Sequence, residues 1–378
     1  MNGEIKGKIV SVLNAAFGNL TVNADINESD IPILASVFNR QSLLPFLVNG
    51  LRNMGYSDLL TEDLKKKEAR AIFDYTQRKT ALDEIAYAFE SEKISFVPLK
   101  GSTLCDLYPE PWMRTSNDID VLVRAEDLSK AINVLSIKTS FKYLKKESHD
   151  VHFINKYVHL ELHFSLLSSL YKLDSILLNP WAYIDEKSDL CRCNFTKEFN
   201  LVYIIAHTAK HFIKCGGIGI RPILDIFILK TKTKFDEKIV KQLCDKAGIL
   251  GFYNTCCLLI DAWFYNGKRD DVTVYFEELV LSGGVFGSKD LKLVSNKRKD
   301  SGKKYISGRI FKSSEDIKNY YPKCRKHPIL VPFYQIVRWA KVFRINKIKS
   351  YISEFKQADS IDQSEVDKYD NLLKFMGL

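Results

Sequence analysis

Apolar side chains recur every three or four residues over most of the first 92 positions, which is the spacing of amphipathic helices. A Ser, Thr or Asp just ahead of such a run can accept hydrogen bonds from the free amides of the first turn. The pattern predicts helices over residues 4–17, over residues 29–54 with Ser29 and Asp30 as the N-cap, and from a Thr61 cap to about Glu92. We therefore expect a helical N-terminal region over residues 1–92.

The pattern then changes to short runs that are apolar throughout or alternate between apolar and polar, as strands do. These runs lie at Ile94–Leu99, Asp118–Val123, Phe141–Leu144, Val151–Asn155 and Val158–Phe164, and a helical pattern from Glu126 to Leu135 separates two of them. Strands interleaved with helices in this order predict a compact core with a mixed sheet over residues 93–175.

Beyond Leu170 the helical spacing returns and predicts a mainly helical C-terminal region over residues 176–378. The expected helices are Phe199–Ile213, Ile220–Leu229, Glu237–Ala247, Tyr253–Trp263, Pro328–Phe343 and Tyr369–Leu378. The predicted fold class is α+β, with a mixed sheet flanked by helices and with helical regions at both ends.

Composition adds an uneven charge to this picture. Of 378 residues, 46% are hydrophobic and 27% charged, which is ordinary for a folded protein with a large core. The net charge is +10, yet residues 289–349 alone hold 18 Lys and Arg against 4 Asp and Glu, a net +14 that leaves −4 elsewhere. Three interpretations stay open for this basic segment: a solvated face, which we favour, an anionic membrane surface, or an RNA contact.

Targeting and redox signals are weak. The N-terminus lacks the apolar stretch and cleavage site of a signal peptide, and no window approaches the roughly 18 apolar residues of a transmembrane helix. Eight cysteines show none of the paired spacings of zinc sites. The expectation is a cytoplasmic protein with reduced thiols and no transmembrane segment.

The candidate chemistry begins at Asp118 and Asp120. Residues i and i+2 of a strand point to the same face, so the two carboxylates would project together. They repel each other unless a cation neutralises them, and Mg²⁺ prefers oxygen ligands and keeps positions for phosphate. Glu161 supplies a third carboxylate, because it shares a strand face with His159 and His163 while Leu160 and Leu162 face the core. The pattern indicates metal-dependent phosphoryl transfer, against the alternative of an ordinary polar sheet edge.

Lys100, Gly101 and Ser102 form the second half of the candidate site. Glycine lets a backbone approach a ligand closely, and a helix that begins at Ser102 would offer free amides to an anion. Lys100 adds a positive charge beside this turn. The simpler alternative is a strand-to-helix turn with a serine cap.

At this point the chain resembles the nucleotidyltransferases with the DNA polymerase β-like fold, which carry a Gly-Ser turn, then D-x-D on the next strand, then a third carboxylate on a later strand. It is most similar to an uncharacterised bacterial family with the pattern L-K-G, Y, R, D-I-D-L-L-V, H and E-L-H. The matching residues are Leu99-Lys100-Gly101, Tyr108, Arg114, Asp118 to Val123, His152, Glu161-Leu162-His163 and, further on, His207, His211, Arg221 and Asp225. Sixteen residues separate Ser102 from Asp118, more than is typical of the wider superfamily.

The resemblance implies a role for each of these residues. Asp118 and Asp120 would hold two Mg²⁺ ions, and Glu161 would complete the second metal site and help to deprotonate the acceptor. Lys100, Gly101 and Ser102 would bind the phosphates of an NTP, which Arg114 would also neutralise unless it is a plain surface arginine. The implied reaction moves NMP from the NTP to a hydroxyl of a small molecule, a protein or an RNA, with release of pyrophosphate.

The remaining polar residues keep alternatives open. His152, His163 and His211 would support the metal ligands or contact the acceptor, or make structural hydrogen bonds only. His207 and His211 have a zinc-like i,i+4 spacing, but residue 208 is Thr rather than the Glu of the H-E-x-x-H pattern. Arg221 and Asp225 are also i,i+4 and would pair with each other, facing the cleft or the solvent.

Two rival functions also stay open. One is a toxin-like nucleotidyltransferase that modifies tRNA or protein. The other is a non-catalytic nucleotide-binding or regulatory module on the same fold, which the three clustered carboxylates count against.

Overall fold

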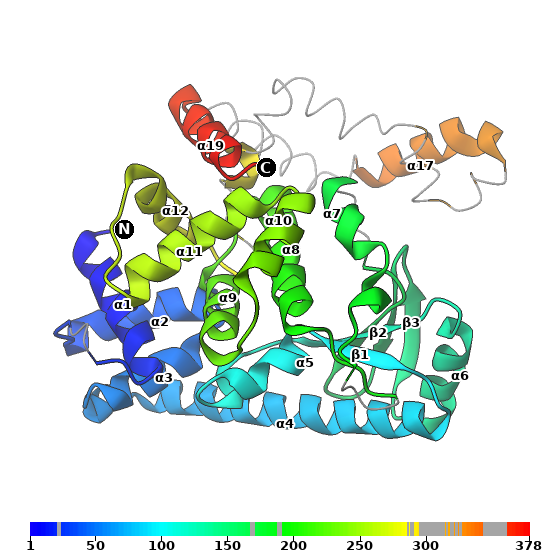
Figure 1. Ribbon diagram of the computed structural model, residues 1–378, viewed down its shortest axis with the longest axis horizontal. Coiled ribbons are helices and arrows are strands. Elements are labelled where there is room, and N and C mark those ends of the chain that lie inside the picture. The colour runs from blue at the N-terminus through cyan, green and yellow to red at the C-terminus, as the bar shows by residue number, and fades with distance from the viewer. Residues whose placement is uncertain are drawn as a thin grey trace.

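The fold is α+β, with a five-stranded mixed sheet and helices on both of its sides (Figure 1). The computed structural model describes residues 1–20, 24–166, 171–186, 191–285, 287, 291–294, 327–342 and 361–378, with single positions at 314, 317, 321 and 324. The fold class predicted from the pattern of apolar positions is confirmed.

The sheet has the order β1-β2-β5-β4-β3. Only β2 and β5 run parallel, and the other neighbours are antiparallel. All five predicted strands are present, with ends shifted by one or two residues: β1 Phe96–Leu99, β2 Asp118–Val123, β3 Lys142–Lys146, β4 Asp150–Ile154 and β5 His159–His163. Pro98 lies in β1, an edge strand, where a missing amide donor is tolerated.

The N-terminal helices follow the predicted pattern with one interruption. They are α1 Gly3–Ala16, α2 Ile31–Arg40, α3 Leu44–Asn53 and α4 Glu62–Ser91. Thr61 caps α4 by accepting a hydrogen bond from the amide of Leu64, as predicted. The pattern over residues 29–54 is two helices rather than one.

The predicted cap is confirmed in position only: Asp30 is the N-cap residue of α2, but its side chain makes no capping hydrogen bond to that helix. The Asn27 side chain accepts from the amide of Ser29, and the Asp30 carboxylate accepts from the amide of Asn27, which forms a capping box around a short 3₁₀ turn. Asp30 also pairs with Lys8 of α1, so its carboxylate ties the first two helices together.

The predicted helices of the central and C-terminal regions are confirmed, with their ends moved by several residues at most. Sequence periodicity missed α7 and α12, and α19 begins earlier than predicted, at a cap made by Asp362. The bounds are α5 Gly101–Leu104, α6 Leu128–Lys138, α7 Tyr171–Leu177, α8 Lys197–Cys215, α9 Ile220–Lys232, α10 Glu237–Lys246, α11 Leu250–Phe264, α12 Asp271–Ser282, α17 Val331–Val342 and α19 Gln363–Phe375.

Two hydrophobic cores are present, one on each face of the sheet. One face buries Ile119, Val121 and Leu160 against α6 and the C-terminal end of α4. The core on the other side is mainly helical, and it joins α1–α3 with α8–α12 and α19. The division of the chain at residues 92 and 175 stays a prediction.

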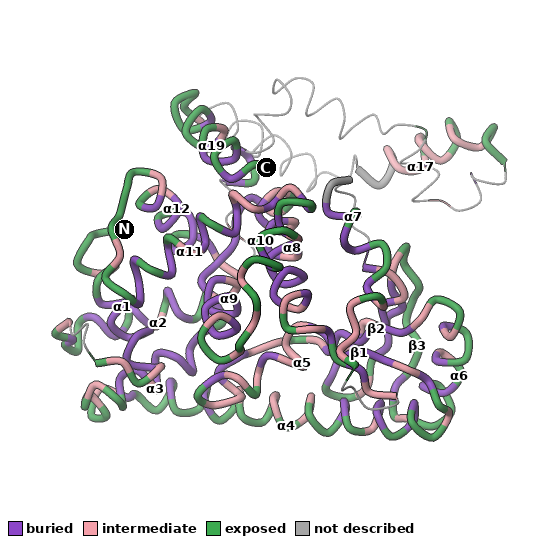
Figure 2. The backbone as a smooth tube through the Cα atoms, in the orientation of Figure 1, coloured by how far each residue is buried: buried purple, intermediate pink, exposed green. Residues whose placement is uncertain are grey.

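Helix α4 takes part in both cores. Leu64, near its start, packs in the helical core, and Ile85 and Phe89, near its end, pack against the sheet. The helix therefore runs beneath the whole body of the protein in Figure 1, while most of its middle is exposed or half-buried in Figure 2. A single rigid element sets the position of the sheet relative to the N-terminal helices.

Most of the basic segment 289–349 lies outside the described residues, so its three interpretations stay predictions. Within it, α17 exposes Phe333 and Ile336. All eight cysteines are free thiols. A search of the helices in the described part of the chain finds none with the length and apolar character needed to cross a membrane.

Breaking α4 in its exposed middle should destabilise the whole protein. Thr76→Pro removes a helix hydrogen bond and introduces a steric clash, so the free energy of unfolding should fall by about 3 kcal/mol or more. Chemical denaturation measures this change, and Thr76→Ala, which keeps the helix, is the control. A loss of less than about 1 kcal/mol in the proline variant would contradict the role given to α4.

Candidate active site

A cavity of about 700 Å³ opens on the polar face of the sheet, within the size range of ligand sites in proteins. Its floor is formed by β2, β4 and β5, and its walls by α4, α8 and α9. The alternation of the strands explains the polar floor, because the apolar residues of β2 and β5 pack on the opposite face. The side chains that share this face include Asp118, Asp120, Asp150, His152, His159, Glu161 and His163.

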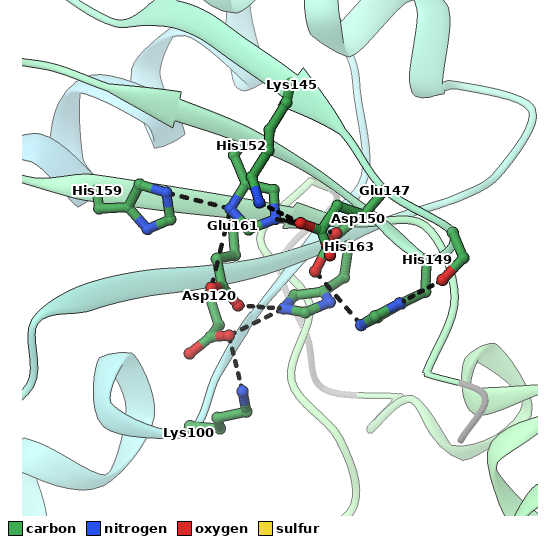
Figure 3. A network of polar contacts seen from close by, with 11 residues as sticks. Lys100, Asp120, Lys145, Glu147, His149, Asp150, His152, His159, Glu161 and His163 are labelled. Carbon is green, nitrogen blue, oxygen red and sulfur yellow. Dashed lines mark hydrogen bonds and ion pairs between the residues drawn. The ribbon is translucent and has the colours of Figure 1, made fainter. Parts of the chain in front are cut away.

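Asp120 and Lys100 form one end of a polar network that continues through His163 (Figure 3). The Oδ1 atom of Asp120 is 2.8 Å from the Lys100 ammonium and 2.9 Å from Nε2 of His163, and Asp120 is only 4% exposed. Burial alone would raise the pKa of this carboxyl, but the charge of Lys100 and the hydrogen bond from His163 outweigh it and hold the pKa well below its usual range. Asp120 is therefore an anion at neutral pH.

Glu161 lies directly beside Asp120. The two residues are partners in the parallel pairing of β2 with β5, so their side chains leave the sheet next to each other. His163 Nε2 is 3.6 Å from the Glu161 carboxylate, and this interaction lowers the pKa of Glu161. Burial lowers the pKa of His163, but its bonds to the two carboxylates dominate and raise it. The predicted common face of His159, Glu161 and His163 is confirmed, and Asp120 projects from the same face of the sheet.

Asp118 lines the same cavity nearer to solvent. Its Oδ1 atom accepts a hydrogen bond of 2.8 Å from the Ser116 hydroxyl. The donor atoms of Asp120, Glu161 and His163 lie within 4.8 Å of one another, whereas Asp118 belongs to no such close group among the described residues. Ser116 therefore holds Asp118 somewhat apart from the other two carboxylates.

Lys100 reaches Asp120 from a strained backbone position. It follows β1 directly and has φ 51° and ψ −118°, a conformation that glycine adopts far more readily than lysine. Such strain costs on the order of 1–3 kcal/mol and is concentrated at functional sites. Burial alone would lower the pKa of Lys100, but the Asp120 charge outweighs it and raises the pKa above its usual value, so the ammonium is charged at neutral pH.

Gly101 and Ser102 begin the short helix α5, as predicted, but neither lines the cavity in the described part of the chain. A Cβ atom at residue 101 would lie 2.8 Å from Nη1 of Arg114. The structure therefore gives Gly101 a packing function, since it leaves room for the Arg114 side chain. Phosphate binding by Gly101 and Ser102 stays a prediction.

Arg114 is a buried residue rather than a surface arginine. Its Nε and Nη2 atoms donate to the two oxygens of Asp225 at 3.1 and 2.8 Å, and the Tyr108 hydroxyl donates to the same carboxylate at 2.6 Å. The predicted pairing of Asp225 with Arg221 is wrong, because Arg114 occupies both carboxylate oxygens. Arg221 instead donates to the Thr115 carbonyl and lines the cavity.

Four of the histidines form two pairs, one on the sheet and one on α8. His152 and His159 face each other on β4 and β5, with Nδ1 and Nε2 3.1 Å apart, and His152 Nδ1 is 4.0 Å from Glu161. His207 and His211 lie on α8 with ring centroids 4.5 Å apart. Burial and the charge of Lys100 lower the pKa of His211 to about 4. His163 is in direct contact with two carboxylates, whereas acceptor binding by His152 and His211 stays a prediction.

Sequence analysis missed the cationic wall that α4 contributes. Lys67, Arg70 and Arg78 line the cavity, and Arg78 donates to the Ser116 carbonyl at 2.6 Å. Lys210 of α8 lies on another wall. The helical spacing of these basic residues was visible in the sequence, but a charged helix face is ordinarily solvated, and only the tertiary packing shows that this face covers a cavity.

Carboxylates on two adjacent strands of a mixed sheet are the arrangement that the resemblance to nucleotidyltransferases implies. The comparison with protein families agrees with this class. Residues 27–265 match the family described as uncharacterised nucleotidyltransferase, and the chain belongs to that family. A search of curated proteins found no match.

Removing the Asp225 charge should destabilise the fold, because Arg114 would be left buried without its counter-ion. We expect Asp225→Asn to lower the free energy of unfolding by about 3–5 kcal/mol. Chemical denaturation is the measurement. The matched control is Asp74→Asn, which breaks an exposed pair with Arg70 and should change stability by about 1 kcal/mol at most. Equal effects of the two variants would refute the structural role of Asp225.

Acidification should act on the fold through His211. Its folded pKa of about 4 lies below its usual value of 6.5, so the unfolded chain binds the proton more readily and stability falls as pH drops. Between pH 7 and pH 5 this residue should cost about 2 kcal/mol of stability. Denaturation curves at the two pH values should show a smaller loss for His211→Gln. The same loss in both proteins would exclude His211 as its source.

Proposed function

We propose that this protein is a Mg²⁺-dependent nucleotidyltransferase that moves NMP from an NTP to a hydroxyl acceptor and releases pyrophosphate. The observation that carries the proposal is the register of β2 with β5, which sets Asp120 beside Glu161 in a cavity that Asp118 also lines. Membership of the nucleotidyltransferase family supports the general reaction.

The donor set fits a hard divalent cation. Asp118, Asp120 and Glu161 offer carboxylate oxygens on one face of the sheet, and the lowered pKa values of Asp120 and Glu161 keep both in the anionic form that ligates a cation. These three residues would hold Mg²⁺. When bound, the metal supplies charge neutralisation on the phosphates and lowers the pKa of the acceptor hydroxyl.

The cavity walls suit a triphosphate. Basic side chains surround the carboxylates from three elements: Lys67, Arg70 and Arg78 on α4, Lys210 on α8 and Arg221 on α9. The sheet floor of the cavity is acidic and its helical walls are mainly basic, a separation of charge that would favour contact of the phosphates with the walls. In this proposal Lys100 neutralises Asp120, Arg114 shapes the wall through Asp225, and the phosphates contact the cationic walls.

The acceptor hydroxyl would lose its proton to Glu161, whose carboxylate is 24% exposed toward the cavity. The neighbouring His163, with its raised pKa, would hold the Glu161 carboxylate in place by donating to it. A carboxylate acting this way typically accelerates a reaction about 10²–10⁴-fold. The acceptor is a small molecule, a protein or an RNA, and labelled NTPs incubated with cell extract would identify it.

The central test is the removal of one carboxylate charge at a time. Asp118→Asn and Asp120→Asn should each lower nucleotide transfer, measured as pyrophosphate release, by about 10³-fold, because several kcal/mol of transition-state charge stabilisation would be lost. Glu126→Gln, an exposed acid beyond the end of β2, is the matched control and should leave the rate unchanged.

The alternatives give different results in the same experiment. If the protein binds NTPs but Mg²⁺ supports no transfer at any acceptor, the chain is a non-catalytic binding module and the proposed function is wrong. Toxicity on expression that Asp120→Asn relieves, with label on tRNA or protein, would identify the toxin-like form of the reaction.

A further inference from the structure

A second group of metal-type donors lies on the hairpin that joins β3 and β4. The segment Glu147-Ser148-His149-Asp150-Val151-His152 holds two carboxylates and two imidazoles within six residues. Asp150 and His152 are i,i+2 on β4, so both side chains leave the same face of the sheet. Glu147 lies in the turn, which a hydrogen bond of 2.9 Å from its amide to the Asp150 carbonyl closes.

Two buried polar atoms in this group face each other without a hydrogen bond. Asp150 Oδ1 and His152 Nε2 are 3.2 Å apart, which is an ion pair only when the imidazole is protonated. The two residues are 3% and 8% exposed, and neither atom has a hydrogen-bond partner among the described residues. A buried polar atom left unsatisfied costs about 1–3 kcal/mol. Two such atoms aimed at one point indicate a missing positive charge between them.

The other nitrogen of His152 strengthens this interpretation. Nδ1 lies 3.1 Å from Nε2 of His159 (Figure 3). With the proton of His152 on Nδ1 and donated to His159, the Nε2 lone pair points at the Asp150 carboxylate. Two acceptors in that arrangement repel each other, and a bound cation is the natural partner for both.

The spacing of the donor atoms suits a transition metal. Glu147 Oε1 lies 3.8 Å from His152 Nε2, which places it on the same side as Asp150 Oδ1. Ligands about 2.1 Å from a tetrahedral Zn²⁺ ion are about 3.4 Å apart, close to the observed 3.2 and 3.8 Å. A set of one imidazole and two carboxylates leaves a fourth position for water or a ligand.

We propose that Glu147, Asp150 and His152 form a Zn²⁺-type metal site, separate from the Asp118–Asp120–Glu161 carboxylates. The imidazole ligand favours Zn²⁺ over Mg²⁺, which takes oxygen ligands almost exclusively. On binding, Glu147 releases Lys145, an exposed side chain that now pairs with it. Asp150 keeps its second oxygen for His149, whose Nε2 is 3.4 Å away.

The site would fix a side chain that borders the catalytic carboxylates. His152 Nδ1 is 4.0 Å from Glu161, so a metal on Nε2 holds the imidazole ring at a set orientation beside that residue. A partner on the second nitrogen of a metal-bound histidine typically orients the ring and tunes the metal. Here His159 is that partner.

The test is a titration of the full-length protein with Zn²⁺ alone, by calorimetry, and with Co²⁺ as a spectroscopic probe of histidine and carboxylate ligation. To exclude the catalytic carboxylates, the titration is made in Asp118→Asn/Asp120→Asn. This variant should bind one Zn²⁺. Adding Asp150→Asn or Glu147→Gln should weaken binding at least about tenfold, whereas adding Glu126→Gln should not.

Any other outcome would contradict the proposal. Loss of Zn²⁺ binding in Asp118→Asn/Asp120→Asn assigns the metal to the catalytic carboxylates. Unchanged affinity in Glu147→Gln, combined with a loss in His149→Gln, assigns it to His149, Asp150 and His163 instead. Circular dichroism checks that Asp150→Asn folds. If it does not fold, Glu147→Gln tests the metal site instead, because the Glu147 side chain is exposed.

Discussion

The parallel pairing of β2 with β5 is the constraint on which the candidate active site depends. It is the only parallel pairing among strands β1 to β5, and it joins strands separated by α6, β3 and β4 in the chain. Its register aligns Asp120 with Glu161, and a shift of one residue would turn Glu161 into the apolar core and Leu160 or Leu162 into the cavity. The burial of those leucines therefore fixes the register, and the register in turn fixes the distance between the carboxylates.

Much of this arrangement could be predicted because it follows from local periodicity. Alternation along Asp118–Val123 and His159–His163 showed which side chains share a face. Because the apolar side chains of these strands face the core, each strand has only one possible orientation. The long helix from Thr61 was equally clear, since its cap and its spacing agree. Helices α7 and α12 were not predicted, although the buried apolar residues of each recur at helical spacing.

The parts that could not be predicted depend on contacts between distant segments. Arg114 and Asp225 are 111 positions apart, and nothing local shows that they would pair in preference to Arg221, one turn away from Asp225. The cationic wall of α4 is similar: Arg78 has the spacing of a solvated helix face, and only the packing of α4 under the sheet places it at the cavity. The turn at Gly101 was located correctly, but its close approach proved to be toward Arg114, a side chain of the protein itself.

The position of Lys100 beside Asp120 affects how the protein would bind its ligands. The chain supplies its own counter-ion to Asp120, so the sheet can assemble with that carboxylate buried and neutralised before any cation is present. In the proposed reaction, a metal ion that binds Asp120 would exchange with this tethered ammonium group. The released ammonium would stay at the cavity, close to the negative charge of an incoming phosphate. In the proposed function, Lys100 would compete with the metal for Asp120 and then interact with the nucleotide.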